Sequence, residues 1–354
     1  MREVDSIRIQ NLYYIFLYTW EKFREGRSIN VGQEDGSNIQ NLLAKILVNS
    51  VKRIIKKGIL KDYKLITNHQ SFIKGKIDFR ESIKKKFLVT NRVTCQYSEM
   101  SEDTFLNSTI KLTLQNLVKS KDLHSEIKQE IWSILKYFED VKPQNSARFY
   151  LSKIDLSQNS NFYRLTIEIC KMIEYLLQPT QIGEENIFKN ILEDEIKMSD
   201  IFERFVANFF RYEQNLLRVK SSEQLEWNFK SLGGDLNLVP KQRTDITLKN
   251  QEKIIIIDTK YYKNSLSESY YEQQKFRSEH LRQITSYMIN MEDISSDEIN
   301  LEGVLLYAEA EGTQKLNEQY FWRGHKVSVK SINLNQNWHD IHNDLLSIIG
   351  QNPI

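Results

Sequence analysis

The chain has 354 residues, of which 40% are hydrophobic and 27% are charged, and its formal net charge is +2. These values are typical of a soluble globular protein of about two domains and exclude a disordered chain. They also exclude a uniformly basic coat for nucleic acid, so any contact with a polyanion must come from local patches.

The sequence shows neither a membrane segment nor a secretory signal. Its longest unbroken aliphatic run spans residues 254–257, far short of the roughly 20 apolar residues that a membrane helix needs. Cys95 and Cys170 are the only cysteines, which argues for a reducing compartment and excludes four-cysteine zinc and iron–sulfur sites. We therefore expect a cytoplasmic protein.

The first half of the chain is predicted to be mostly helical around a strand-rich insert. Apolar residues at helical spacing predict helices at 10–23, 37–57, 101–118, 125–138 and 162–177. Residues 63–97 alternate in short stretches around Gly75, which is typical of strands and hairpins. Pro179 and Gly183 interrupt the last helix, so we expect two domains, 1–183 and 184–354.

The second half has a different order of predicted elements. A helix at 199–216 precedes three strands at 225–229, 244–248 and 253–259, and a helix at 280–291 and a strand at 303–308 follow. The fold class is therefore α+β or α/β, with a mixed sheet flanked by helices in the order αβββαβ.

Two aspartates and a lysine are predicted to meet at the end of a strand. If residues 244–260 form a hairpin turning at 251–252, Asp245 faces Asp258 across the two strands, and Lys260 lies on the same face as Asp258. Opposed carboxylates repel each other unless a cation lies between them, and oxygen ligands suit Mg²⁺ or Mn²⁺. Together with a lysine, such a site is suited to metal-assisted phosphodiester hydrolysis. The spacing alone is equally compatible with a cluster of surface charges.

Further positions are candidates for the same site. Glu203, in the helix before the strands, could add a third carboxylate, although Asp200 and Glu203 also resemble a capping box at a helix start. Gln283 and Tyr287 share a face of the later helix, where they could equally be surface residues.

Taken together, these residues resemble the PD-(D/E)xK nuclease superfamily. The matching segments are Arg243-Thr-Asp245 and Asp258-Thr-Lys260, with Glu203 before them and Gln283-Ile-Thr-Ser-Tyr287 after them. Thr244 replaces the proline that is common beside the first aspartate and has no chemical role. The resemblance implies that Asp245, Asp258 and Glu203 hold the metal, that Lys260 orients or activates the attacking water, and that Gln283 and Tyr287 support the site.

Four segments narrow the resemblance to the McrC family, the nuclease subunits of McrBC-type restriction systems. They are Arg8-Ile-Gln-Asn-Leu-Tyr-Tyr14, Ile73-Lys-Gly-Lys-Ile-Asp-Phe79, Ser101-Glu-Asp-Thr-Phe-Leu-Asn107 and Ile257-Asp-Thr-Lys-Tyr-Tyr262. The resemblance implies an endonuclease that cuts DNA containing modified cytosine. It also implies that the N-terminal half joins a ring-forming AAA+ GTPase, McrB, and stimulates its GTP hydrolysis.

The sequence is consistent with a partner that binds the nucleotide. It contains no Gly-x-x-x-x-Gly-Lys-Ser/Thr loop, so GTP is expected to act only through the partner. A basic segment at 72–92 is a candidate for the element that enters the channel of the ring, although a solvated strand face explains the same charges. Its basic residues are Lys74, Lys76, Arg80, Lys84, Lys85, Lys86 and Arg92.

Two other functions remain open at this stage. The Gln-x-x-x-Tyr motif after Asp-x-Lys also occurs in RecB-like exonucleases, which would degrade DNA from free ends without a GTPase partner. Alternatively, the protein could be an adaptor that activates a GTPase ring, in a system that reads an unmethylated site.

Overall fold

A computed structural model describes residues 7–21, 39–142, 162–179, 186–188, 191–261, 266–268, 274–294, 299–309 and 315–351. The chain divides into two compact units, one formed by 37–189 and the other by 1–36 together with 190–354. The observed boundary lies close to the expected one at 183, but the N-terminal segment belongs with the second half of the chain.

The position of the N-terminal segment follows from its first helix, α1 (Ile9–Thr19). Most of its residues are buried, so it needs cover on several sides. It packs against α9 (Glu195–Glu213), where Asn208 Nδ2 donates to the Tyr18 carbonyl at 2.9 Å and the Tyr18 hydroxyl donates to Glu213 at 2.6 Å. Sequence order alone could not indicate this long-range pairing.

Four helices form the body of the 37–189 unit, and each overlaps a predicted one. They are α3 (Ile39–Lys57), α6 (Phe105–Val118), α7 (Ser125–Leu135) and α8 (Arg164–Leu176). A 3-10 turn, Lys136–Phe138, extends α7, and the short strands β4 (Leu177–Pro179) and β5 (Asn186–Phe188) pair with each other.

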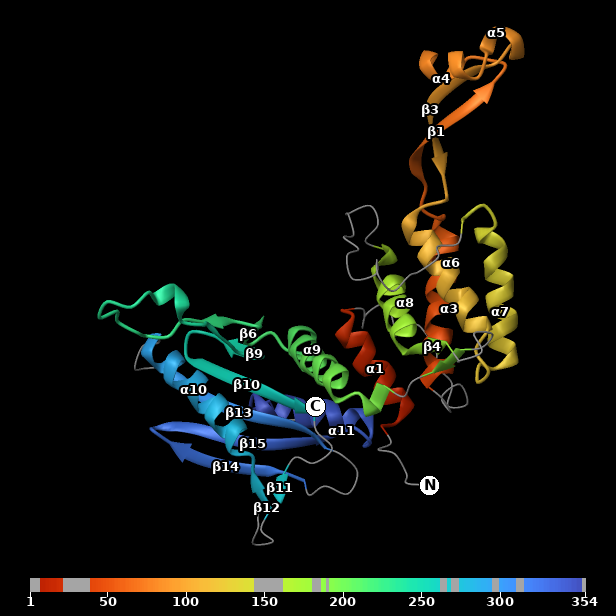
Figure 1. The fold of residues 1–354 in the computed structure, drawn as a ribbon. Helices are drawn as coiled ribbons and strands as arrows, with labels where there is room; N and C mark the ends of the chain where they lie inside the picture. The colour runs from red at the N-terminus through yellow and green to blue at the C-terminus, as the bar shows by residue number, and fades with distance from the viewer. Residues whose placement is uncertain are drawn as a thin grey trace. The chain divides into compact units, whose positions relative to one another are not determined.

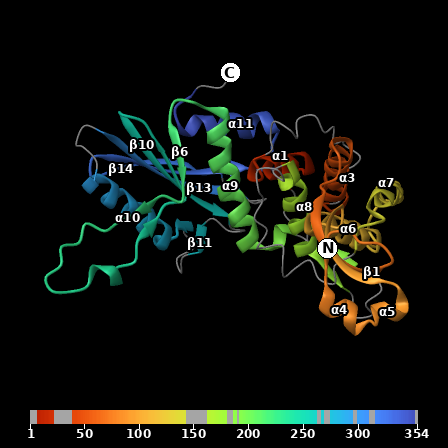
Figure 2. The ribbon, with the colours of Figure 1, turned by 90° about the horizontal axis from the view of Figure 1, so that it is seen from above.

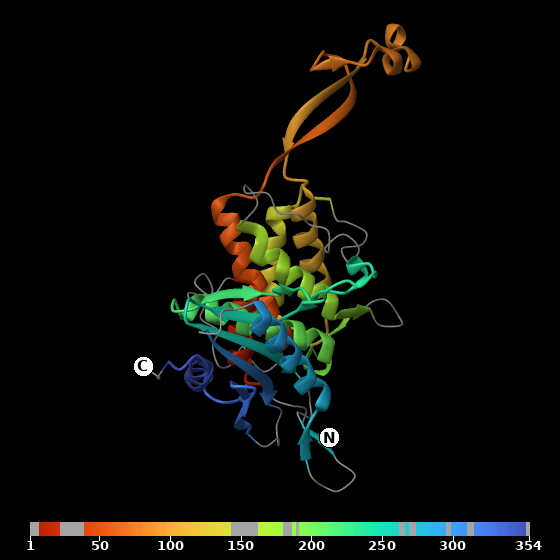
Figure 3. The ribbon, with the colours of Figure 1, turned by 90° about the vertical axis from the view of Figure 1, so that its left-hand side faces the viewer.

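A long antiparallel ribbon extends from these helices (Figures 1 and 3). Strand β1 (Asp62–Gln70) pairs along its whole length with β3 (Val93–Ser101), and β2 (Lys76–Ile77) adds to the far end of β3. The predicted hairpin is present, but two short helices were not foreseen: α4 (Phe79–Lys84) and α5 (Phe87–Thr90). Asp78 caps α4 by accepting a hydrogen bond from the Glu81 amide.

The second unit is built on a mixed six-stranded sheet in the order β14-β15-β13-β10-β9-β6. Strands β10, β13 and β15 are parallel, whereas the other pairings are antiparallel. The bounds are β6 (Arg218–Ser221), β9 (Ile246–Lys249), β10 (Lys253–Tyr261), β13 (Asn300–Glu309), β14 (Asn317–Trp322) and β15 (His325–Asn333). Besides α1 and α9, the helices of this unit include α10 (Ser278–Ile294) and α11 (Trp338–Ile348).

The first of the three predicted strands was misplaced. The range 225–229 contributes only the end of β7 (Gln224–Leu225), which pairs with β8 (Gln242–Arg243), and the true sheet strand is β6. Residues 226–241 instead form a long loop with one 3-10 turn, Leu236–Leu238, and this loop extends away from the sheet (Figure 2). A further pair of short strands, β11 (Leu266–Glu268) and β12 (Gln274–Phe276), precedes α10.

The core of this unit fixes α10 against the strands that carry the site. Ile254 and Ile256 of β10 pack in one cluster with Ile284 and Met288 of α10. At Gly303 of β13, an added Cβ would lie 2.4 Å from the Met288 sulfur, so the helix and the strand approach closely there. Within the described part of the chain, no helix is both long enough and apolar enough to cross a membrane.

Candidate active site

Strand β10 carries Asp258 and Lys260 at its C-terminal end. Its pairing with β9 sets Ile257 opposite Ile246, and the Asn250 amide donates to the Lys253 carbonyl at 3.0 Å at the turn. The predicted hairpin register is confirmed for 246–249 with 254–257. Asp245 lies in a bend directly before β9, one position beyond the last paired residues, so its opposition to Asp258 stays a prediction.

The Asp245 carboxylate is held by the neighbouring strand. Its Oδ2 accepts hydrogen bonds from the Thr259 amide at 2.8 Å and from the Thr259 hydroxyl at 3.0 Å. Sequence reasoning missed this residue, because Thr259 occupies the unspecified position of the Asp-x-Lys motif. Thr259 lies between the motif residues Asp258 and Lys260 on β10, and its two hydrogen bonds hold the Asp245 carboxylate next to them.

Asp258 is fully buried and depends on one cation. Lys260 Nζ lies 2.6 Å from its Oδ2, and its Oδ1 has no hydrogen-bond partner among the described residues. Burial, followed by the negative charge of Asp245, raises the pKa of Asp258 to about 7, against the opposing effect of Lys260. This carboxylate therefore carries a desolvation cost that a second cation would offset.

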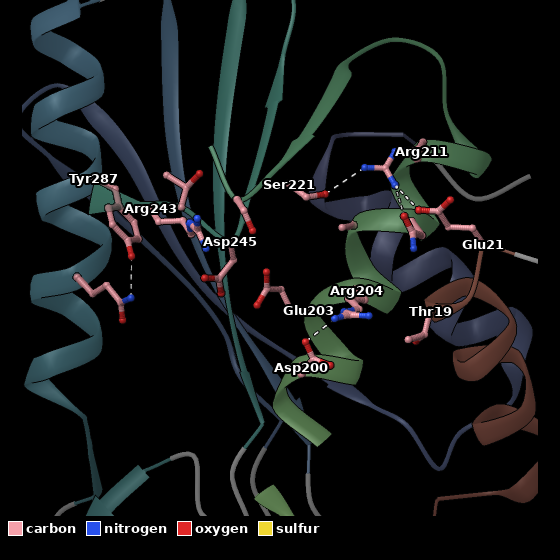
Figure 4. Close-up of a pocket in the computed structure, with 15 residues that line it drawn as sticks. Thr19, Glu21, Asp200, Glu203, Arg204, Arg211, Ser221, Arg243, Asp245 and Tyr287 are labelled. Carbon is pink, nitrogen blue, oxygen red and sulfur yellow. Dashed lines mark hydrogen bonds and ion pairs between the residues drawn. The ribbon is translucent and has the colours of Figure 1, made fainter. Parts of the chain in front are cut away.

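Glu203 approaches the same region from α9. Figure 4 shows its carboxylate and that of Asp245 in the middle of the pocket. Burial raises the pKa of Glu203 to about 7, with further contributions from Asp245 and Asp200. The capping-box alternative is wrong, because α9 begins at Glu195 and Asp194 is its N-cap.

Gln283 and Tyr287 lie on one face of α10, as their spacing predicts, and both belong to the site. Lys260 Nζ donates to Gln283 Oε1 at 3.1 Å, and Gln283 Nε2 donates to the Tyr287 hydroxyl at 2.8 Å. The pKa of Tyr287 is raised, mainly by burial. This chain of hydrogen bonds fixes the position of the lysine amine.

A pocket of about 640 Å³ is lined by Asp245, Glu203, Gln283 and Tyr287, whereas the buried Asp258 and Lys260 lie behind its lining. Its walls include several polar residues to which the sequence assigned no role, from α1, α9, β6 and the turn after it, and β8. These residues are Thr19, Glu21, Arg204, Asn208, Arg211, Ser221, Ser222 and Arg243. Arg243 belongs to a motif segment that the sequence matched, but nothing in the sequence indicated that the α9 arginines line the same pocket.

The donor set is suitable for a hard divalent cation. Of the residues that the structure describes, no three His, Cys, Asp or Glu side chains form a ready metal cluster. Mg²⁺, however, typically binds one or two carboxylates and completes its shell with water and substrate phosphate oxygens. The buried Asp258 Oδ1, which has no hydrogen-bond partner among the described residues, lies next to the charges of Asp245 and Glu203 and fits such an ion.

The basic segment forms a second candidate surface at the end of the ribbon. Lys74 lies 3.5 Å from Glu99, and Lys84 lies 2.8 Å from Glu81. The other basic residues form no ion pair with any described residue; they are Lys76, Arg80, Lys85, Lys86 and Arg92. Large apolar side chains are exposed beside them, at Phe72, Ile73, Phe79, Ile83, Leu88 and Val89. The sequence reading had not foreseen this apolar patch.

Comparisons with known proteins agree with this architecture. The family model described as "McrBC 5-methylcytosine restriction system component" matches residues 9–308. The Escherichia coli "Type IV methyl-directed restriction enzyme EcoKMcrBC" is 29% identical over 350 residues, which cover 99% of each chain. A Thermococcus gammatolerans structure of McrB AAA+ hexamers with bound McrC matches the fold with a TM-score of 0.55 at 13% identity, covering 96% of this chain and 76% of that one.

Proposed function

Because this chain belongs to the family of McrBC 5-methylcytosine restriction system components, we propose that it is the DNA endonuclease subunit of a GTP-dependent, McrBC-like system. The proposed reaction is metal-assisted hydrolysis of a DNA phosphodiester bond. The E. coli relative is described as methyl-directed, which supports DNA with modified cytosine as the substrate. We place the reaction in the cytoplasm.

One observation carries the assignment of the reaction. Asp258 and Lys260 form a buried ion pair at the end of β10, and the Asp245 carboxylate accepts two hydrogen bonds from Thr259, the residue between them. The elements around them follow the order α9, β6, β9, β10, α10, β13, apart from the small β7–β8 and β11–β12 pairs. We take this order as support for the nuclease assignment, because a PD-(D/E)xK core is expected to have the order αβββαβ.

We assign the metal to Asp245, Asp258 and Glu203, with Mg²⁺ as the natural ion and Mn²⁺ as a substitute. When bound, the ion would polarise the scissile phosphate and lower the pKa of a coordinated water. Lys260 would orient that water or neutralise charge on the phosphate. Gln283 and Tyr287 would hold the lysine amine in place through their hydrogen bonds.

We also propose an AAA+ GTPase ring as the partner and the end of the ribbon as the element that binds it. The described McrB hexamers with bound McrC support a ring of this kind. Residues 72–92 combine exposed cations with exposed apolar side chains, a composition suited to an acidic channel with an apolar lining. GTP would be bound by the ring, and this subunit would stimulate its hydrolysis.

The decisive experiment uses the full chain with its GTPase partner. Asp258→Ala should abolish DNA cleavage and leave GTPase stimulation intact. Asp258→Asn tests the charge without removing the side chain, and Glu252→Gln, at the exposed turn between β9 and β10, is the matched control. Unchanged cleavage in both Asp258 variants would remove this residue from the mechanism, and a wild-type complex that stimulates GTPase without cutting DNA would favour the adaptor function.

A further inference from the structure

The pocket carries three arginines, and two of them already have acidic partners. Arg204 Nε donates to Asp200 at 3.1 Å, and an Arg211 nitrogen lies 3.8 Å from Glu21. For Arg243, in contrast, no side-chain hydrogen bond or ion pair exists with any described residue. Figure 4 shows Arg243 on the Asp245 side of the pocket and Arg211 beyond Glu203. Arg243 is therefore the pocket arginine that is available for an external anion.

The absence of an ion pair between Arg243 and Asp245 is informative. The two residues are two positions apart along the chain, and both line the pocket. The Asp245 carboxylate is instead held by Thr259 through two hydrogen bonds to Oδ2. The guanidinium thus lines the pocket with its five donors uncommitted, in a geometry that matches a phosphate.

Ser222 supplies a second polar group on the same wall. Its backbone has φ +53°, a left-handed conformation that is uncommon outside glycine, and its amide donates to the Asp245 carbonyl at 2.9 Å. Ser222 lines the pocket, and its hydroxyl forms no hydrogen bond with any described residue. Strained backbone of this kind persists where surrounding contacts enforce it, and it is frequent at ligand sites.

We propose that Arg243 and the Ser222 hydroxyl form a subsite for a non-scissile phosphate of the DNA backbone, next to the phosphate that is cut. This inference rests on the proposed nuclease function. The pocket has a volume of about 640 Å³, whereas one water molecule occupies only about 30 Å³ in the liquid. The pocket therefore has room for a phosphate group. A phosphate held there fixes the register of the strand over Asp245 and Asp258 without reading its bases.

A phosphate contact has a signature in the salt dependence of DNA binding. Each neutralised phosphate contributes about −0.9 to the slope of log K against log salt concentration on duplex DNA. Arg243→Ala should therefore make the slope shallower by about 0.9 for any duplex sequence, and it should raise the KM for cleavage about tenfold. Arg243→Lys should retain most of the slope, because it keeps the positive charge.

The experiment measures duplex binding in EDTA, and cleavage in Mg²⁺, with the full chain and its GTPase partner. Lys241→Ala is the matched control, because Lys241 is exposed, pairs with Glu226 at 2.7 Å and does not line the pocket. Stabilisation by Mg²⁺ should be equal in wild type and Arg243→Ala. An unchanged salt slope and KM in Arg243→Ala would overturn the proposal, as would a loss of Mg²⁺ affinity, which would place Arg243 in the metal site.

A glycine substitution separates binding from folding. Ser222→Gly suits the left-handed backbone and removes the hydroxyl, so we expect equal or higher thermal stability together with a two- to fivefold loss of DNA affinity. Unchanged affinity would exclude the hydroxyl from the subsite. If the wild-type complex binds DNA but never cuts it, the nuclease function fails, while the salt slope in EDTA still tests the phosphate contact.

Discussion

Thr259 holds Asp245 with both its amide and its hydroxyl, at 2.8 Å and 3.0 Å from the same carboxylate oxygen. The residue between Asp258 and Lys260 thereby fixes the third polar group of the site. Because β10 carries Asp258, Thr259 and Lys260, a shift of this strand would move these three residues together, and Asp245 with them through its bonds to Thr259. One strand end therefore determines the relative positions of both aspartates and the lysine.

Thr259→Val should impair catalysis more than folding. The substitution removes the hydroxyl bond to Asp245 but keeps the amide bond, and a hydrogen bond to a charged group contributes about 1.5–3 kcal/mol. If that contribution is expressed in the transition state, kcat/KM for DNA cleavage falls by roughly 10- to 100-fold. Steady-state cleavage with the partner ring measures this loss.

Thr247→Val is the control for that prediction. Thr247 is buried on the neighbouring strand, and its hydroxyl pairs with that of Thr244 at 3.0 Å. The substitution should cost comparable stability and leave cleavage close to wild type. Equal losses of activity in the two variants would show that Thr259 acts through general packing of the sheet.

Gln283 and Tyr287 should act on catalysis as one unit. Gln283→Ala removes the acceptor for Lys260 Nζ, whereas Tyr287→Phe removes only the group that orients Gln283. We expect a larger loss of kcat from the first change than from the second, and the double variant should be no worse than Gln283→Ala alone. A double-mutant cycle on single-turnover cleavage measures the coupling, and additive losses would contradict a relay through Gln283.

The sequence predicted the parts of the site that are set by local pattern. The hairpin register follows from the turn at 251–252 and the buried run 254–257, so the pairing of β9 with β10 could be worked out in advance. The strand assigned to 225–229 was wrong, because the aromatic residues Trp227 and Phe229 stack on each other in an exposed loop instead of packing in the sheet. The exposed fraction of a side chain depends on tertiary contacts, which an apolar pattern does not report.

Contacts between distant segments were equally inaccessible from the sequence. Nothing local indicates that α1 packs on α9 or that Arg243 shares a pocket with Arg211. At the ribbon end, neither α4 nor α5 was predicted, and Leu88 is 84% exposed. Solvent-exposed apolar surface of this kind can be recognised only once the fold is known. It is the feature that indicates a binding partner.

Binding of Mg²⁺ should strengthen as the pH rises through 7. The pKa values of Asp258 and Glu203 are both raised to about 7, so the metal-free fold retains protons that an unfolded chain has already released. Its stability consequently falls as the pH rises between the ordinary carboxyl pKa near 4 and the raised value near 7. Mg²⁺ must displace these protons below pH 7, which costs roughly tenfold in affinity per pH unit for each proton.

Calorimetric titration with Mg²⁺ at pH 6 and pH 8 measures this effect. The affinity should be at least tenfold higher at pH 8, and the increase in Tm on adding Mg²⁺ should be correspondingly larger. Asp258→Asn should bind the ion weakly at both values. Equal Mg²⁺ affinity at pH 6 and pH 8 in the wild type would contradict the assignment of these carboxylates as ligands.

The end of the ribbon should contribute to partner binding through separable charge and apolar effects. Replacing Lys84, Lys85 and Lys86 by glutamate should slow association with the GTPase ring at least tenfold at low salt, and the effect should shrink as salt screens the charges. Leu88→Asp combined with Val89→Asp should weaken the complex at every salt concentration, because it removes apolar contact area. Both variants should fold, since all five side chains are exposed.

Binding kinetics and GTPase stimulation are the measurements for both ribbon variants. Charge reversal of Lys119 and Lys136, which are exposed on the helical part of the same unit, is the control. Normal stimulation by both ribbon variants would exclude this surface as the element that engages the ring.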